Sequence, residues 1–458
     1  MASGRVPNWV WAVLFATHLL ALGWVLTTGS WDFPDSGRYV QAADNLRIHG
    51  KLYARPWPDI PPQGQAVQEF TIRPIGYPLA VLGLQAGIAR SVVLLVVQNL
   101  LSLLNIGLVL SWWSRWAQPK TRQWIIAVAG VLSFPAQLIY ANAVMSEMLL
   151  QTAAVAMVGS GLRFIETRRT WYFAGIVGAA IAALLLKPVF YPLVMIVAAL
   201  GVWLAWRGKR MSLAIIGLIP LVVAVLYMDW NKERTGYFHF SSIAEINLLH
   251  YNAAGVVRRI AGPAAEEKWV ASVLLKANAQ PTFKARQHVI QARAWAMLWA
   301  HPVVYARQHV QGMAVLFLDP GRFDVSHFLQ MEPSSHAGGL LAEAQTGGLM
   351  RALGRLPLGM MGVLGLVLLA NAARLVLAVQ GLWRLKDSEP RLRYGRWAAL
   401  GLLLYVALLT GPLGAARFLV PVWPLLFGLA LAGLQTGAGL ELSGAHETAP
   451  AGEYQRQS

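Results

Sequence analysis

Long uncharged stretches recur along the chain and are separated by short basic loops. The first, residues 8–28, has no Lys, Arg, Asp or Glu over 21 residues. About 20 apolar residues cross roughly 30 Å of hydrocarbon, and a cleaved signal segment has a shorter apolar part. We therefore predict that 8–28 is a retained transmembrane helix. Nine further stretches meet or approach this length: 91–113, 123–142, 143–162, 171–187, 188–206, 211–228, 356–376, 397–411 and 418–436.

The basic residues predict the orientation, because cytoplasmic loops of membrane proteins are enriched in Lys and Arg. With a cytoplasmic N-terminus, the cytoplasmic connections within 114–122, 163–170, 207–210 and 384–396 are all basic. Residues 75–89 are uncharged over only 15 residues. A full span there would turn every later basic loop outward, so we expect a short helix that dips into the outer interface.

The sequence thus predicts an all-α polytopic membrane protein with about ten transmembrane helices, both termini cytoplasmic and two large outward loops. Residues 1–230 form the N-terminal transmembrane module, which includes the first outward loop, 29–90. Residues 231–355 form the second, with amphipathic helices near 264–278 and 282–312. Residues 356–436 hold the last spans, and 437–458 form a polar cytoplasmic tail.

Composition agrees with this architecture. The chain is 56% hydrophobic and 13% charged, whereas soluble domains carry about 25% charged residues. A net charge of +17 could indicate nucleic-acid binding, but much of the excess lies in loop two, beside a membrane surface, so no nucleic-acid partner is expected. The absence of cysteine excludes disulfides and thiol chemistry.

The strongest local signal lies in the first outward loop, at residues 31–39 (WDFPDSGRY), where an apolar pattern of helical spacing begins at Tyr39. Asp35 precedes this helix, a position at which an acid commonly caps the backbone. A carboxylate beside a membrane is also suited to be a general base that takes a proton from an acceptor hydroxyl. The two roles are compatible, and both stay open.

Other charged residues predict a site on the same face. Glu69 and Arg73 follow in the first loop, and an Arg offers a fork of donors suited to phosphate, although it could equally pair with lipid headgroups. Ionisable residues at the outer ends of spans favour a functional role, but the two bases among them could simply extend toward the interface. These residues are Glu147, Lys187 and Arg417.

No motif calls for a metal or a cofactor. The ten histidines show no metal-ligand spacing, and the chain has no Asp-x-Asp, Walker or Gly-x-Ser-x-Gly motif. We therefore expect neither metal nor cofactor, and no chemistry on soluble nucleotide sugars.

At these residues the sequence resembles the GT-C superfamily of polytopic glycosyltransferases, nearest to its protein O-mannosyltransferase and lipid A aminoarabinose-transferase branch. The motifs occur in family order over roughly residues 30–430: PDSGRYVQAADNL, GKLY, RPIGYPL, NAVMSEMLL, KPVFYPL and ARFLVPVWPLL. Lys187 and Phe418 depart from the Arg-Pro and Arg-Tyr pairs usual in the family.

The resemblance implies an inverting glycosyltransferase of the plasma membrane that moves a sugar from a polyprenyl-phosphate donor to a hydroxyl of a glycan, lipid or protein at the outer face. It implies Asp35 as the base, with Glu69 as a second acid. Arg73, Lys187 and Arg417 would hold the donor phosphate, and Tyr39, Tyr77 and Glu147 would contact substrate. The alternatives are a transporter or flippase of lipid-linked sugars, which predicts ionisable residues at mid-span, and a ligase or polymerase of surface glycans.

Overall fold

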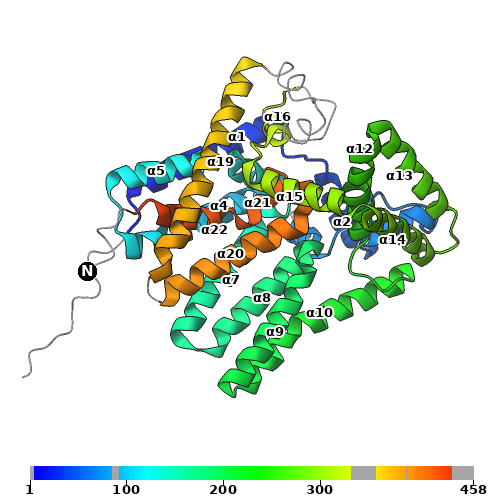
Figure 1. Ribbon diagram of the computed structural model, residues 1–458, viewed down its shortest axis with the longest axis horizontal. Coiled ribbons are helices and arrows are strands. Elements are labelled where there is room, and N and C mark those ends of the chain that lie inside the picture. Colours follow the sequence, from blue (N-terminus) through cyan, green and yellow to red (C-terminus); the bar gives the residue numbers. More distant parts are fainter. Residues whose placement is uncertain (1–4, 85–91, 332–356, 388–389, 436–458) are drawn as a thin grey trace, which may run out of the picture.

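The computed structural model describes residues 5–84, 92–331, 357–387 and 390–435. Within these ranges the chain is helical, with no strand (Figure 1). Eight helical segments have the length and apolarity needed to cross a membrane. They are α1 (Asn8–Thr28), α4 (Val92–Ala117), α7 (Glu147–Thr167), α9 (Tyr191–Gly208) with the turn before it, α10 (Met211–Thr235), α19 (Leu358–Arg384), α20 (Pro390–Thr410) with the turn after it, and the broken span of α21 (Ala416–Leu419) and α22 (Trp423–Gly433).

The two other predicted spans also appear as helices. The stretch 171–187 is α8 (Thr170–Leu186), and 123–142 is a pair, α5 (Thr121–Leu132) and α6 (Pro135–Ala141), bent by 58°. The bend lies at Pro135, which lacks the N–H that would continue α5. Arg374 of α19 covers the break by donating to Gly130 O (3.0 Å) and Ser133 Oγ (2.9 Å). The polytopic all-helical architecture is confirmed, and the span predicted at 123–142 is bent.

The basic loops gather at one end of the helix bundle, as the topology requires. Arg210 donates to Arg168 O at 2.6 Å, and Arg391 pairs with Glu166 at 2.6 Å. Glu166 lies at the far end of α7 from Glu147, and a helix of 21 residues is about 31 Å long. The bundle therefore has a basic end and an opposite end. Which of them faces the cytoplasm stays a prediction.

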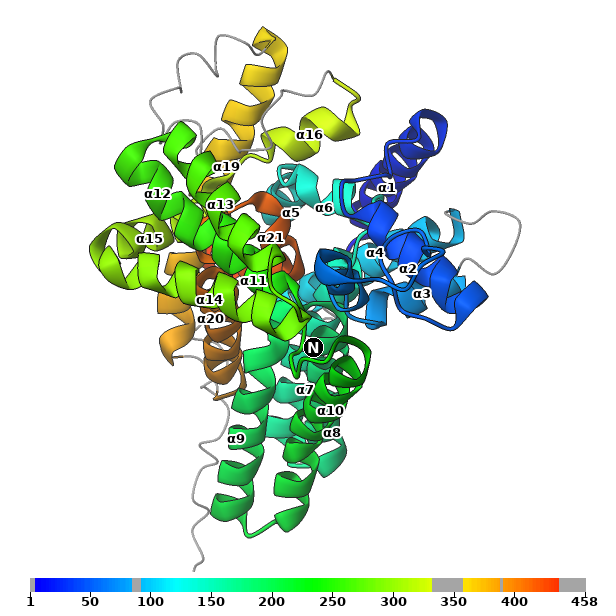
Figure 2. The same cartoon turned by 90° about the vertical axis from the view of Figure 1, so that its right-hand side faces the viewer.

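The outward loops form helices at the opposite end. Loop one contains α2 (Ser36–His49), a 3-10 helix (Gly64–Phe70) and α3 (Gly76–Leu84), which occupies the described part of 75–89. Loop two contains α11 (Ile243–Asn247), a π-turn (Leu248–Ala253), α12 (Ala254–Ala261), α13 (Pro263–Asn278), α14 (Phe283–Ala300), α15 (Pro302–Leu318) and α16 (Arg322–Phe328). In Figure 2, α2 and α3 lie on one side of α21, and α12, α13 and α15 lie on the other.

One detail of loop two differs from the expectation. The amphipathic stretch 282–312 is two helices, because Pro302 disfavours a helical conformation at His301 and ends α14. The predicted tail, 437–458, and residues 332–355 of loop two lie outside the described residues.

Loop two touches the link between α20 and α21 backbone to backbone. A Cβ on Gly312 of α15 would lie 2.1 Å from Gly411 O, and one on Gly414 would lie 2.1 Å from Gly312 O. Only glycine permits this approach. The contact holds α15 against the turn that precedes Arg417.

A layer of uncharged polar side chains lies inside the bundle. His18 Nε2 is 2.9 Å from Ser102 Oγ, and Gln137 donates to the same hydroxyl at 2.8 Å. Gln137 and Gln151 exchange hydrogen bonds, and Gln151 also donates to Val420 O at 2.7 Å. That carbonyl also accepts the 3-10 hydrogen bond of Trp423 N, while its α-helical partner position is occupied by Pro424, which has no N–H.

The orientation is testable because the chain has no native cysteine. Single cysteines introduced as Gly37→Cys and Gly208→Cys lie at opposite ends, and both positions are exposed. We expect a membrane-impermeant maleimide to label the first from outside intact cells and the second only after the membrane is opened. The reverse pattern would contradict the predicted topology and the face assigned to the site.

Candidate active site

Five of the six predicted charged residues meet at the end opposite the basic loops. Arg73 donates to Asp35 Oδ1, and Arg417 Nη2 donates to Asp35 Oδ2 at 2.7 Å. Arg417 Nε donates to Glu147 Oε1 at 2.8 Å, and Lys187 Nζ to the same oxygen at 2.6 Å. The result is one continuous ion network, which we call the Asp35–Glu147 network, assembled from five separate segments of the chain.

Asp35 occupies the N-cap position of α2, but its side chain makes no capping hydrogen bond. Ser36 Oγ instead accepts the hydrogen bond of Phe33 N. Both carboxylate oxygens of Asp35 are engaged by arginines, and its side chain is 21% exposed. Asp35 is therefore committed to the ion network rather than to the helix end.

The pKa of Asp35 reflects these partners. Burial raises it, but the positive charges of Arg73 and Arg417 outweigh burial and lower the pKa of Asp35 to about 2. A general base works best with a pKa near the operating pH. While both arginines hold it, Asp35 is a stable anion and a weak base.

Arg417 lies where its span is interrupted. Pro421 and Pro424 deny helical N–H partners to the carbonyls four residues before them, so the span divides into α21, a 3-10 turn and α22. The short α21 turns Arg417 toward Glu147 and Asp35, its partners in the network. This irregular backbone at the end of a span is where the guanidinium bridges two acids.

Lys187 and Arg73 reach the network through a close contact between loop one and α8. Lys187 precedes Pro188 and has an extended backbone (φ −146°, ψ 132°), as residues before proline favour, so it leaves α8 and reaches Glu147. A Cβ on Gly76 would lie 2.6 Å from Leu185 O. Glycine at this position lets the segment that carries Arg73 lie against the end of α8.

Glu147 is the innermost member of the network. It is the first residue of α7, and its side chain is fully buried. Oε1 receives two cationic donors, whereas the buried Oε2 has no hydrogen-bond partner among the residues that the structure describes. A buried acceptor left unpaired is costly.

Three positive and two negative side chains leave the network with one excess positive charge. The exposed fractions of the Arg73, Lys187 and Arg417 side chains are 10%, 13% and 21%. Charges at partly buried positions are weakly screened. The network is therefore suited to bind one more anion at its exposed edge.

Glu69 does not join this network. It is buried and pairs with Arg38 (3.4 Å) and Arg55 (3.3 Å). It belongs to loop one, as Asp35 and Arg73 do, but contacts within that loop hold it in a separate cluster.

Tyr39 and Tyr77 lie beneath Arg73. The Arg73 guanidinium is 5.1 Å from the centre of the Tyr39 ring, which packs edge-on against Tyr77 at 4.7 Å. Tyr77 donates to Gln98 at 2.8 Å. Both tyrosines are buried, 1% and 0% exposed, so in this arrangement they support Arg73 and are closed to a ligand.

Three residues beside the network were not identified from the sequence. Tyr140 donates to Asp324 Oδ1 at 2.8 Å. Asp319 Oδ2 accepts from Ala416 N at 2.9 Å, next to Arg417, and its Oδ1 accepts from Gly321 N at 3.2 Å. One signal was available: these two aspartates are the only acidic residues in the stretch 268–331.

Nothing among the described residues forms a group of three or more His, Cys, Asp or Glu side chains that could hold a metal ion.

No family model and no curated protein matches the chain. Two solved structures are similar to it: crystal structures of ArnT from Cupriavidus metallidurans. The form bound to undecaprenyl phosphate has a TM-score of 0.37 and 17% identity, covering 93% of this chain and 77% of that one. The apo form has a TM-score of 0.35 and 16% identity, covering 93% and 76%. At these values the similarity assigns neither a residue nor a substrate to this chain.

Asp324 offers a test of this arrangement through pH. Burial raises the pKa of Asp324 from its ordinary value of 3.8 to about 7. The folded protein therefore binds a proton more tightly than the unfolded chain, and its stability falls as the pH rises from about 4 to about 7. In Asp324→Asn the amide oxygen still accepts from Tyr140 and carries no charge at any pH. We expect the wild-type melting temperature in detergent to fall between pH 5 and pH 8 by more than that of the variant. Parallel curves would contradict the buried position of this carboxyl.

Proposed function

We propose that the protein is an inverting glycosyltransferase that moves a sugar from a polyprenyl-phosphate donor to a hydroxyl of a glycan, lipid or protein, at the outer face of the plasma membrane. The observation that carries this proposal is the Asp35–Glu147 network. It joins three cations to two carboxylates at the end of a transmembrane bundle, where the phosphate of a lipid in the bilayer would lie. The order of the sequence motifs supports the same class.

In the proposed reaction, Asp35 takes the proton of the acceptor hydroxyl. The acceptor oxygen then bonds to the anomeric carbon from the face opposite the phosphate. The bond from that carbon to the phosphate oxygen breaks, and its electron pair leaves on polyprenyl phosphate, so the configuration inverts. Arg73, Arg417 and Lys187 stabilise the charge that grows on the departing phosphate.

The ion pairs of Asp35 connect donor binding to base strength. The arginines that hold the pKa of Asp35 at about 2 are also the proposed phosphate ligands. A bound phosphate competes for their donors, weakens their hold on Asp35 and moves its pKa upward. Asp35 would therefore become an effective base only when the donor is bound.

The contacts made by the ionisable residues inside the spans favour an enzyme over a transporter. His18 and Arg374, which lie within α1 and α19, are both buried. His18 bonds to Leu14 O (2.8 Å) and Ser102, and Arg374 bonds to Asn371 (2.6 Å), Gly130 and Ser133. These are neutral packing partners, and such contacts suit structural roles better than a path for a moving charged substrate.

We expect Asp35→Asn to reduce transfer by about 10²–10⁴-fold, the usual contribution of a positioned base. Asp32→Asn is the matched control, because Asp32 is exposed and its backbone oxygen, not its carboxylate, bonds to His327. Transfer is measured with a labelled lipid-linked sugar and a fixed amount of folded protein. A loss of less than threefold in Asp35→Asn would argue against the base.

We expect Arg417→Ala to weaken binding of polyprenyl phosphate by roughly tenfold or more, since a hydrogen bond to a charged group contributes about 1.5–3 kcal/mol. Arg417→Lys should be intermediate, because one ammonium cannot replace both the Nε and Nη2 contacts. Arg55→Ala, whose side chain is 61% exposed, is the control. Titration of polyprenyl phosphate against monodisperse protein decides the matter, and wild-type affinity in Arg417→Ala would exclude the phosphate clamp.

A further inference from the structure

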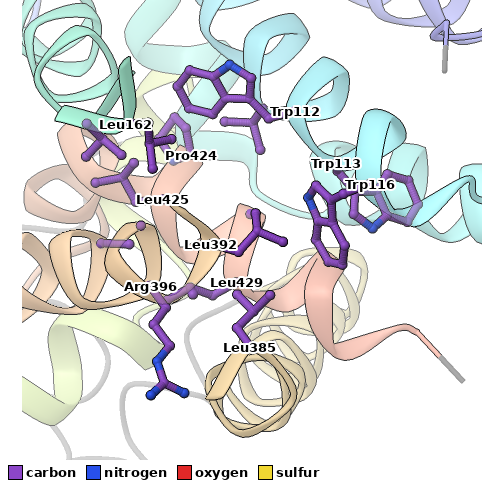
Figure 3. A pocket seen from close by; sticks show the side chains of 15 residues that line it. Trp112, Trp113, Trp116, Leu162, Leu385, Leu392, Arg396, Pro424, Leu425 and Leu429 are labelled. Carbon is purple, nitrogen blue, oxygen red and sulfur yellow. The ribbon is translucent and has the colours of Figure 1, made fainter. Parts of the chain in front are cut away.

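A cavity of about 100 Å³ lies near the basic end of the bundle, remote from the Asp35–Glu147 network. It is enclosed by α4, α7, α20 and α22 and is lined almost wholly by carbon (Figure 3). Trp112, Trp113 and Trp116 of α4 form one wall, and Leu392 and Arg396 of α20 line another. Trp112 and Trp116 are only partly buried, so the cavity is not sealed inside the protein.

Unpaired donors belong to two residues that line this apolar space, Trp113 and Arg396, and to Arg391, which precedes the lining residue Leu392. Trp113 is 2% exposed, and its Nε1 is buried without a partner in the described ranges. Arg396 donates through Nη1 to Leu382 O at 2.8 Å, but its buried Nε has no acceptor among the described residues, and the same holds for Arg391 Nε. Buried donors without acceptors are costly, and an acceptor-rich ligand would satisfy them.

The charge around the cavity is strongly positive. The segment 384–396 contains five basic and two acidic residues. Glu166, which pairs with Arg391 and Arg163, accounts for only part of this excess. Basic pockets between transmembrane helices are suited to anionic headgroups, and tryptophan is enriched at the level of the membrane interface.

The size and position of the cavity suit a hydrocarbon chain. A dry cavity of about 150 Å³ takes up benzene, so about 100 Å³ accommodates a short part of an acyl chain. An acyl chain gains little free energy when it moves from the lipid bilayer into the protein, because both environments are apolar. Selective retention must therefore come from the headgroup, through its charge.

We propose that this cavity binds an anionic phospholipid of the leaflet at the basic end, with part of an acyl chain between α4 and α20 and the phosphate on Arg396 and Arg391. The site shares no residue with the Asp35–Glu147 network. The lipid-binding proposal can therefore be tested independently of the proposed transferase activity.

Native mass spectrometry of the detergent-purified protein tests the proposal. The protein is titrated with phosphatidylglycerol or with phosphatidylcholine of the same acyl chains. We expect the wild type to retain phosphatidylglycerol at least fivefold better, and Arg396→Gln to lose about fivefold of that retention. Arg207→Gln removes an exposed basic residue of α9 at the same end and should behave as wild type.

A second variant separates the cavity from the charge. Leu392→Trp fills the cavity and keeps every basic residue, and we expect it to lose the bound lipid while remaining monodisperse. Equal retention of the two lipids by the wild type would overturn the proposal. So would equal losses in Arg396→Gln and Arg207→Gln, or full retention by Leu392→Trp.

Discussion

The arrangement of the site depends on one side chain, the guanidinium of Arg417, which bonds at once to Asp35 and Glu147. Its two carboxylate partners come from positions 382 and 270 residues earlier in the chain. Removing it would leave Glu147 buried with Lys187 alone and Asp35 with Arg73 alone. Because buried charges are tolerated only when paired, these five residues constrain one another, and loop one, α7, α8 and α21 are held in register by charge.

The bundle supplies the backbone conformation that this bridge requires. Pro421 and Pro424 interrupt the last span after Arg417, and the carbonyl of Val420, which accepts from Trp423 N, also accepts from Gln151. Gln151 belongs in turn to the polar layer that reaches His18 through Gln137 and Ser102. Inside hydrocarbon, polar side chains are the donors available to backbone that departs from a regular helix. The polar layer thus contributes to the stability of this irregular segment.

Much of the architecture could be predicted because bilayer thickness imposes a simple length rule on each span. The gathering of charged residues at one end of the bundle could be predicted as well, since Asp35, Glu147, Lys187 and Arg417 all lie near the ends of spans that are opposite the basic loops. Which acid pairs with which base could not be predicted. Glu69 has the same residue type and face as Asp35, yet it bonds to Arg38 and Arg55, and no sequence period distinguishes the two. Likewise, the hydropathy of 123–142 is continuous, and only Pro135 indicates that the helix bends.

The glycine contact between α15 and the turn before Arg417 has a mechanical consequence. With no side chain between Gly312 and Gly411, there is no soft layer to absorb a relative shift of the two backbones. Loop two is therefore held directly against the turn that precedes Arg417. A displacement of α15 would move this turn with it, because backbone lies against backbone.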